Sequence, residues 1–404
     1  MPEVVLAGCT PEPLMSYLKA LGVFRLIAEQ ADPAAKLSWR NGVSIVHTIF
    51  PREEVVDFFV NKYQPTPVVT PWNGGSGFYR TWDEKTNRFR HREAVDRVCF
   101  LRQSKEARLE PYRTVLSQID VTLASYAKSI DVRSMPTKER KATLLLDEKH
   151  GILDAEQAGL LPYLRASLPD KALEWLDTVM LLQTEDTRAA PLFISGGNDG
   201  NFDFSVTFIG FLQSLFTEID VSRPRFCSSV FGEGLVGADG GSAGHFNPGG
   251  MGGPNGGQGF EGQGAVNPWD FVLMIEGALL LAGAVTRRFG VQTGDRVAFP
   301  FCVSPVAAGF GSAASIDETS DGCRTELWLP LWLSHASLPE LRCLFAEGRA
   351  QVGRRQARNA VEFALFFVRP QMRPFLDRCF LLQCSFRMIS QAEGVVKDGP
   401  LNFF

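Results

Sequence analysis

Two short turns rich in glycine and asparagine carry the residues best suited to chemistry in this sequence. In Ser195–Asn201 (SGGNDGN), small residues, amides and one acid follow a predicted strand. The amide of Asn198 offers a donor and an acceptor together, which is how such a side chain reads the edge of a base. Trp72–Phe78 (WNGGSGF) has the same capacity and adds aromatic rings that can stack on bases. Both segments also match ordinary turn chemistry. The candidate contacts are Asn73, Gly75, Ser76, Gly196, Gly197, Asn198, Asp199 and Asn201.

A third candidate is the glycine-rich segment 232–264, which contains 15 of the 38 glycines of the chain. Glycine has no side chain and loses the most backbone freedom on ordering, so this composition does not predict a packed core. The segment is either a disordered linker or a loop whose backbone amides close on a bulky anion. In the second case, Asn247 and Asn255 are its candidate contacts.

An arginine cluster lies near the C-terminus. The segment Gly348–Phe363 is predicted to be helical, and it brings Arg354, Arg355 and Arg358 close together. On a helix, Arg354 and Arg358 would share one face. Clustered guanidinium groups bind phosphate oxygens well, so this pattern predicts contacts with a nucleic-acid backbone.

Several catalytic signatures occur in the chain without the flanking elements that they need. GGSAG (Gly240–Gly244) matches the nucleophile elbow, but glycine loop is expected on both sides instead of a strand and a helix. GEGLVG and GQGFEG match the dinucleotide pattern, with a strand expected only before the first and a helix only after the second. No GxxxxGK[ST] motif is present, and the five histidines lack metal-ligand spacing. We therefore expect no catalytic residue, no metal and no cofactor.

The charge and cysteine content restrict the class of protein. The 404-residue chain has a formal net charge of −4, which excludes a globally basic nucleic-acid coat. The segment Arg80–Arg113 nevertheless has ten Lys or Arg against six Asp or Glu, which suits local phosphate contacts. The eight cysteines are dispersed without a CxxC pair, and no signal peptide is visible. We expect free thiols and a cytoplasmic location. The apolar run in 267–285 is too short for a bilayer and predicts a buried core helix.

The predicted elements are mixed α+β, without the alternation of a doubly wound sheet. Apolar residues at three- and four-residue steps predict a helix after Thr10, and Asn41-Gly42 predicts a hairpin turn. Asn267 before Pro268 is typical of a helix N-terminus. The other expected elements are a strand at 4–7, a short helix from Pro51, helices at 98–130, 154–166, 169–182 and 204–217, strands at 191–195, 298–303 and 326–332, and a helical, arginine-rich part from Leu338. We divide the chain into an N-terminal α+β domain (1–150), a helical segment with the SGGNDG turn (151–231), the glycine-rich loop (232–266) and a C-terminal part (267–404).

Taken in order, seven segments resemble one known family, the large subunit of the type I-G (formerly I-U) CRISPR Cascade surveillance complex. The resemblance covers nearly the whole chain up to about Val361 and implies a mixed multi-domain large-subunit architecture. The segments are LGVFRLIAEQAD (21–32), PWNGGSGF (71–78), DKALEWLDTV (170–179), PLFISGGNDGNFDFS (191–205), VNPWDFVLMIEGALLL (266–281), AFPFCV (298–303) and ELWLPLW with EGRAQVGRRQAR (326–358).

The resemblance implies a non-catalytic subunit of an RNA-guided complex. Such a subunit recognises the protospacer-adjacent motif on double-stranded DNA and supports duplex opening and R-loop formation, while guide pairing reads the remaining sequence. The implied partners are crRNA, target DNA, the backbone and crRNA-end-binding Cascade subunits, a small subunit and a recruited helicase-nuclease, with no membrane. Family members usually continue with a further helical region, whereas this chain ends at Phe404. We expect the small-subunit function on a separate polypeptide, or a shortened form here.

Two other functions stay open from the residues alone. A nucleotide-binding or hydrolytic enzyme would use the glycine-rich loop as a phosphate cradle and would bind nucleotide stoichiometrically. A structural scaffold would use the same loop as a linker, and protease would cut it rapidly with or without DNA.

Overall fold

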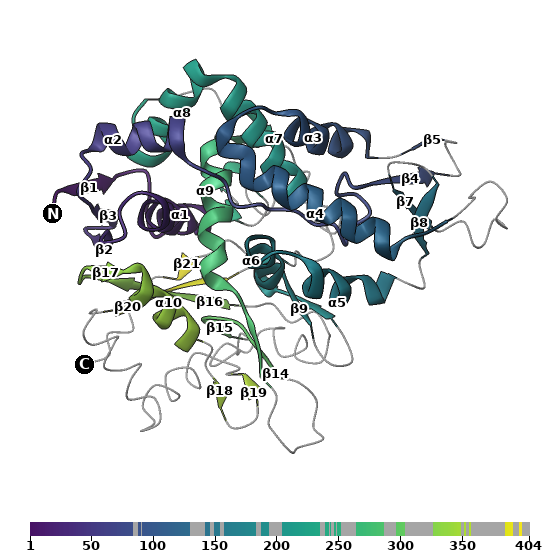
Figure 1. Cartoon of the computed structure of the whole chain (residues 1–404). Coiled ribbons are helices and arrows are strands. Elements are labelled where there is room, and N and C mark those ends of the chain that lie inside the picture. The colour runs from purple at the N-terminus through teal and green to yellow at the C-terminus, as the bar shows by residue number, and fades with distance from the viewer. Residues whose placement is uncertain are drawn as a thin grey trace. The chain divides into compact units, whose positions relative to one another are not determined.

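The computed structural model has a mixed α+β architecture of helices and small antiparallel sheets, as the sequence predicted (Figure 1). Two compact units interleave along the chain, so they do not coincide with the four consecutive segments drawn from the sequence. Unit 1 comprises Met1–Asn61, Thr178–Asn201 and Asp220–Phe404, and unit 2 comprises Lys62–Asp177 and Phe202–Ile219. The residues that the structure describes are 1–83, 88–89, 91–129, 142–145, 149–153, 157–182, 187–193, 204–234, 239–241, 243, 246–247, 249–251, 264–286, 296–303, 326–348, 351–352, 355–356, 384–390 and 396–397.

Unit 1 is organised around helix α1 (Leu14–Gln30), in which every residue from Leu14 to Ala28 is buried. A helix buried on all sides belongs in the interior of a domain. Its main neighbour is α9 (Pro268–Ala278), which confirms the predicted core helix. The side chain of Asn267 accepts a hydrogen bond from Trp269 N at 3.0 Å, which confirms the predicted N-cap.

The crossing of α1 and α9 requires glycine on both helices. A Cβ atom at Gly22 would lie 2.0 Å from Leu273 O, and a Cβ atom at Gly277 would lie 1.8 Å from Leu18 O. Neither clash can be relieved by turning a side chain, because each involves backbone atoms. The two helices are therefore in backbone contact at this point.

The same interface contains two ion pairs, of which Arg25–Glu276 is buried and Lys19–Asp270 is partly exposed at the acid. Lys19 Nζ lies 2.6 Å from Asp270 Oδ1 and donates to the carbonyl of Ser229 at 2.6 Å. Arg25 Nη2 lies 3.2 Å from Glu276 Oε2, and Glu276 is fully buried. Loss of one partner would leave an uncompensated charge in the interior, so the pairs hold the two helices in one register.

The first sheet of unit 1 packs one face on α1. Its strand order is β1 (Glu3–Leu6), β3 (Val43–His47), β2 (Lys36–Arg40) and β17 (Ala336–Ser337), all antiparallel. Asn41 and Gly42 adopt φ values of 53° and 75°, which is the predicted hairpin turn. Trp39 stacks on Tyr17 of α1 with ring centroids 5.3 Å apart.

Asp32 joins the end of α1 to this hairpin. Its carboxylate accepts hydrogen bonds from Thr48 Oγ1 at 2.7 Å, Ile49 N at 3.0 Å and Ala34 N at 3.1 Å. Burial acts to raise the pKa of Asp32, but these three bonds to the charged form hold the pKa below its ordinary value.

The other elements of unit 1 are mostly short. A second sheet has the order β15 (Cys302–Val303), β16 (Glu326–Trp332), β20 (Cys384–Ser390) and β21 (Val396–Lys397). Trp332 Nε1 donates to Leu37 O at 2.7 Å, so β16 is hydrogen-bonded to the first sheet. The remaining elements are α2 (Arg52–Asp57), continued by the π-helix η1 (Phe58–Lys62), β9 (Met180–Leu182) paired with β10 (Thr187–Ala189), η4 (Pro191–Phe193), α8 (Ile219–Phe231), β11 (Asp239–Gly241) paired with β12 (Gly264–Val266), η6 (Gly249–Met251), η8 (Leu279–Leu281), β13 (Ala284–Thr286) paired with β14 (Arg296–Ala298), α10 (Leu338–Glu347), and β18 (Gln351–Val352) paired with β19 (Arg355–Gln356).

Unit 2 combines helices with a five-stranded sheet. Its core joins the segment 63–70 to α4 (Glu110–Tyr126). Val68 N donates to Tyr112 Oη at 2.8 Å, and that hydroxyl donates to Val68 O at 2.9 Å. The helix predicted at 204–217 is confirmed as α7. The helices are α3 (Arg92–Gln103), η2 (Ala107–Leu109), α4 (Glu110–Tyr126), α5 (Gln157–Ser167), α6 (Asp170–Val179) and α7 (Phe204–Thr217). The sheet order is β5 (Arg88–Phe89), β4 (Tyr79–Asp83), β7 (Ala142–Leu145), β8 (His150–Leu153) and β6 (Lys128–Ser129).

The length and hydropathy of each helix decide whether it could span a membrane. No single helix in the described ranges is long and apolar enough to cross a bilayer, although α7 and α8 meet that criterion when taken together as a bent pair.

The single long helix predicted at 98–130 is wrong. The chain forms α3 and α4, with Ser104 extended between them at ψ 137°. Pro111 stands in the first turn of α4, where proline is tolerated because it needs no hydrogen-bonded N–H. In a continuous helix, the same proline would have removed an interior hydrogen bond.

Three further predictions of secondary structure are wrong. The strand expected at 298–303 is interrupted, since β14 ends at Ala298 and β15 begins at Cys302. The strand expected at 191–195 is a 3₁₀ turn over its described part, Pro191–Phe193, and the strands lie upstream as β9 and β10. The C-terminal part is not helical beyond Glu347, since its described residues form β18, β19, β20 and β21. Helix α10 ends at Gly348, whose carbonyl accepts from Phe301 N at 2.8 Å instead of from a further turn of helix.

We expect Gly22→Ala to lower the free energy of unfolding of the chain by about 2 kcal/mol or more, because the new methyl group overlaps the backbone of α9. Chemical denaturation of the full chain measures the change. Gly249→Ala is the matched control, because a Cβ atom there meets nothing within 4 Å. Equal stability of the two variants would contradict the backbone contact between α1 and α9.

We expect Asp32→Asn to be less stable than the wild type at neutral pH, because Asn offers one acceptor oxygen and no charge to three donors. The folded pKa of Asp32 lies below the ordinary value of 3.8, so its contribution is fully present above pH 3.8. The stability difference should shrink as the pH falls through the folded pKa. Urea unfolding at a series of pH values tests this, and a difference independent of pH would contradict it.

Candidate functional site

The turn at Trp72–Gly77 in unit 2 contains three of the predicted contact residues. Gly75 N donates to Asn73 Oδ1 at 3.0 Å, and Ser76 N donates to Asn73 O at 3.1 Å. The Asn side chain thus takes the place of a backbone acceptor and tightens the turn. Asn73 is exposed and Gly75 is half-exposed, whereas Ser76 is buried. From Asn73 to Gly75, the outward surface of the turn is therefore backbone and amide, and Trp72 beside it is partly exposed.

Buried hydroxyl groups hold this turn from beneath. Ser76 Oγ donates to Asn73 O and Tyr79 Oη donates to Pro71 O, both at 2.5 Å. Burial raises the pKa of Tyr79 above its ordinary value, so the phenol stays protonated as a donor. Ser76, predicted as a ligand contact, is placed as a residue that shapes the turn.

The N-terminus of α3 lies against the turn. Gly77 has φ 88°, and a Cβ atom there would lie 2.3 Å from Ala94 O. His91, the residue before α3, has φ 61°, and a Cβ atom on Gly75 would lie 3.4 Å from its ring. We call the surface formed by Asn73, Gly75 and His91 the Asn73 surface.

Many cations of the basic segment 80–113 are already bound within the protein. Arg102 pairs with Asp120 at 2.6 Å, and Arg97 donates to Val206 O at 2.8 Å. Arg113 donates to two backbone carbonyls, and Arg108 is buried over an aromatic ring. Arg92 and Lys105 are exposed. Among the described cations of this segment, Arg92 follows His91 directly, so its backbone adjoins the Asn73 surface.

The described parts of the glycine-rich segment are anchored in unit 1. Strands β11 and β12 pair Asp239 with Val266, near the two ends of the segment. Phe246 is fully buried, with its ring centroid 6.1 Å from that of Phe193. Asn247 Oδ1 accepts from Gly250 N at 3.3 Å, so this predicted contact residue anchors a turn. The segment thus contributes one aromatic side chain to the core, which its composition did not predict.

The surroundings of two rejected motifs differ from those predicted. A helix, α8, precedes GEGLVG where a strand was expected. GGSAG begins inside β11 at Gly240, where only glycine loop was expected. The helix before GEGLVG removes the strand that a dinucleotide-binding turn needs.

The arginine cluster is not helical where the structure describes it. Arg355 lies in β19 and pairs with Val352 of β18. Helix α10 ends at Gly348, so the helix predicted for this segment does not reach Arg355. The other predicted contacts, namely Gly196, Gly197, Asn198, Asp199, Asn201, Asn255, Arg354 and Arg358, lie outside the described residues.

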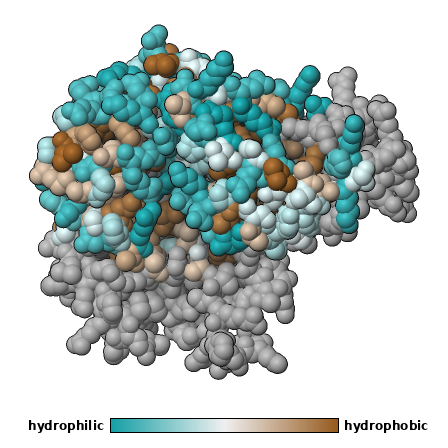
Figure 2. All heavy atoms as spheres, in the orientation of Figure 1, coloured by the Kyte–Doolittle hydropathy of each residue, from teal (hydrophilic) through white to brown (hydrophobic). Residues whose placement is uncertain are grey.

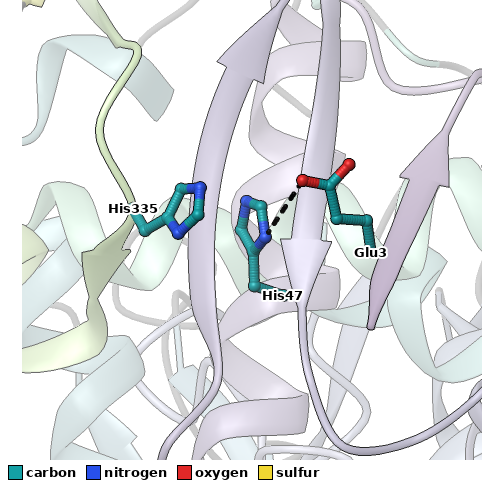
Figure 3. A group of neighbouring side chains, drawn as sticks. All are labelled: Glu3, His47 and His335. Carbon is teal, nitrogen blue, oxygen red and sulfur yellow. Dashed lines mark ion pairs between the residues drawn. The ribbon is translucent and has the colours of Figure 1, made fainter. Parts of the chain in front are cut away.

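A second group of polar side chains was missed by sequence reasoning. Glu3, His47 and His335 meet on the face of the first sheet that is turned away from α1 (Figure 3). The imidazole centroids of His47 and His335 are 3.6 Å apart, and Glu3 Oε1 lies 3.8 Å from His47 Nδ1. These residues come from three distant segments, so no local spacing could have signalled the group. We call it the sheet-face cluster.

The charges around this cluster are uneven. Burial and the neighbouring His335 hold the pKa of His47 below its ordinary value, so His47 is neutral at pH 7. The hydrogen bond from Arg40 holds the pKa of Glu3 below its ordinary value, so Glu3 is an anion.

The surface in Figure 2 is largely hydrophilic with scattered apolar residues, and the exposed apolar side chains of unit 1 include Val5, Ile49 and Leu333.

Comparison with known proteins does not identify a relative. No model of a known protein family matches the chain, and no curated protein sequence is significantly similar to it.

We expect Gly75→Ala to leave the stability of the chain nearly unchanged and Gly77→Ala to lower its melting temperature by several degrees. The Gly75 methyl group would make only ordinary contact with His91, whereas Gly77 combines a left-handed backbone with a clash against α3. Thermal unfolding followed by circular dichroism measures both. Equal melting temperatures for the two variants would contradict the packing of the turn on α3.

Proposed function

We propose that this chain is the large subunit of a type I-G RNA-guided Cascade complex, in which it recognises the protospacer-adjacent motif on double-stranded DNA. In this role, it supports duplex opening and R-loop formation, and a separate helicase-nuclease cuts the target. The ordered set of seven segments that resembles this family is the starting point. Base pairing with the guide reads most of the target, so the protein itself needs only a short motif reader and backbone contacts.

The Asn73 surface is the observation that carries this proposal. A motif reader must bring donors and acceptors to base edges without side chains that clash with the groove. Gly75 exposes backbone there, and Asn73 adds an amide, the side-chain type that pairs with base edges. The buried hydroxyls of Ser76 and Tyr79 keep the turn in one conformation, which reduces the entropy lost on binding.

Cations near this surface suit a nucleic acid, although fewer are free than the sequence suggested. Arg92 is exposed at the start of α3, directly after His91. Arg97 and Arg102 are held in ion pairs, so they support the fold of unit 2. A few phosphate contacts are enough when a complex of several subunits shares the duplex.

The two alternative functions receive less support. The nucleotide-binding alternative relies on glycine motifs, and the first of them, GEGLVG, follows helix α8 where a phosphate-binding turn needs a strand. The linker alternative treats the glycine-rich segment as unattached, whereas its described parts pair through β11 and β12 and bury Phe246.

The test uses the chain assembled with its crRNA-bearing partner subunits and a duplex library randomised beside the target. We expect a short motif to be enriched and this preference to be lost when the chain is omitted. Asn73→Ala and Gly75→Ala should each weaken binding to the preferred motif by about tenfold. Arg92→Ala should weaken binding to all sequences alike and reduce the salt slope by about one.

The matched control for these variants is Lys171→Ala, which removes an exposed cation from α6 of the same unit. It should bind the library as the wild type does. Motif preference that is unchanged in Asn73→Ala and Gly75→Ala would rule out the Asn73 surface as the reader. Binding that is unaffected by omission of the chain would rule out the surveillance role.

A further inference from the structure

The sheet-face cluster follows from the register of the first sheet. Glu3 of β1 stands opposite His47 of β3, His47 stands opposite Lys36 of β2, and Lys36 stands opposite Ser337 of β17. Directly opposed residues point to the same face of a sheet, and so do residues two apart on one strand. His335 precedes Ser337 by two positions, and its ring stacks on that of His47 (Figure 3).

The three side chains present nitrogen and oxygen atoms close to one another. One ligand atom from each of Glu3, His47 and His335 lies within 4.8 Å of the others. Bonds of about 2.0–2.2 Å to a tetrahedral zinc ion place ligand atoms about 3.4 Å apart. His47 is buried and held in place, so the exposed side chains of Glu3 and His335 must close the remaining distance. His335 must also turn out of its stack on His47, because imidazole lone pairs lie in the ring plane and those of stacked rings do not converge on one ion.

Neighbouring groups orient the side chains of His47 and Glu3. Ser38 Oγ lies 2.9 Å from His47 Nε2, and Ser38 is itself buried. When Nε2 donates to this hydroxyl, Nδ1 presents its lone pair toward Glu3. Arg40 binds Glu3 chiefly through Oε2, so Oε1, the oxygen that faces His47, is the one placed to ligate. Metal-bound histidines and carboxylates are commonly oriented by such second partners.

We propose that Glu3 Oε1, His47 Nδ1 and one ring nitrogen of His335 form a binding site for a single Zn²⁺ ion. Two imidazoles and one carboxylate are a borderline ligand set that suits zinc and disfavours Mg²⁺ and Ca²⁺, which bind oxygen. Three protein ligands leave a fourth position for water. Because Glu3 lies on the edge strand β1 and His335 adjoins the edge strand β17, one ion ties both edges of the sheet to β3. The site does not depend on the proposed function in DNA recognition.

The test is calorimetric titration of Zn²⁺ into the full chain after chelator treatment and alkylation of accessible thiols. We expect one ion to bind per chain. His335→Ala and Glu3→Gln should each weaken zinc binding more than 100-fold. Loss of an outer hydrogen-bond partner typically lowers metal affinity about 10- to 100-fold, and loss of a direct ligand should lower it further. Ser38→Ala should fall within that smaller range. His150→Ala, which removes an imidazole from β8 of unit 2, is the matched control and should bind as the wild type does.

Thermal unfolding with and without Zn²⁺ supplies a readout that does not rely on stoichiometry. Zinc should raise the melting temperature of the wild type and of His150→Ala, but not that of His335→Ala. His335 is exposed, so its replacement should leave the metal-free melting temperature unchanged. Absence of zinc binding, or equal affinity and equal stabilisation in wild type and His335→Ala, would overturn the proposal.

Discussion

Backbone contact between α1 and α9 is the constraint on which unit 1 depends. Helices can approach this closely only where both lack side chains, and Gly22 and Gly277 meet that requirement from opposite sides. Lys19 and Arg25 of α1 are buried along this interface, and each pairs with an acid on α9. Helix α9 covers part of the surface of α1, and the first sheet packs on another part through the stacked rings of Tyr17 and Trp39.

Burial of one face of the first sheet explains why polar residues gather on the other. Strand side chains alternate, so the residues between those that pack on α1 must point away from it. Four strands from the beginning, the hairpin and the late part of the chain then bring Glu3, His47 and His335 into one group. The proposed zinc site is thus a consequence of sheet topology, and the proposed reader of unit 2 is a consequence of turn chemistry.

Glycine has different physical roles at different described positions of the chain. At Gly22 and Gly277, it permits backbone contact, and at Gly77 it permits a left-handed backbone next to α3. Gly75 has neither a backbone contact nor a left-handed backbone that would require glycine, since a methyl group there would make only ordinary van der Waals contact. A partly exposed glycine that the fold does not require leaves room for the close approach of a ligand. That contrast separates Gly75 from the many glycines that serve the fold.

The sequence by itself determined the α+β class, the Asn41-Gly42 hairpin, the Asn267 cap of α9, and α7. These features depend on periodicity, helix caps and turn residues, which act between residues a few positions apart. The sequence also predicted the Asn73 turn as a candidate, but not that Ser76 would face inward. Only the tertiary structure decided that Phe246 enters the core, that Gly348 ends α10 against Phe301, and that Glu3, His47 and His335 meet. These outcomes depend on contacts between residues far apart in the chain, and such contacts leave no mark on local spacing.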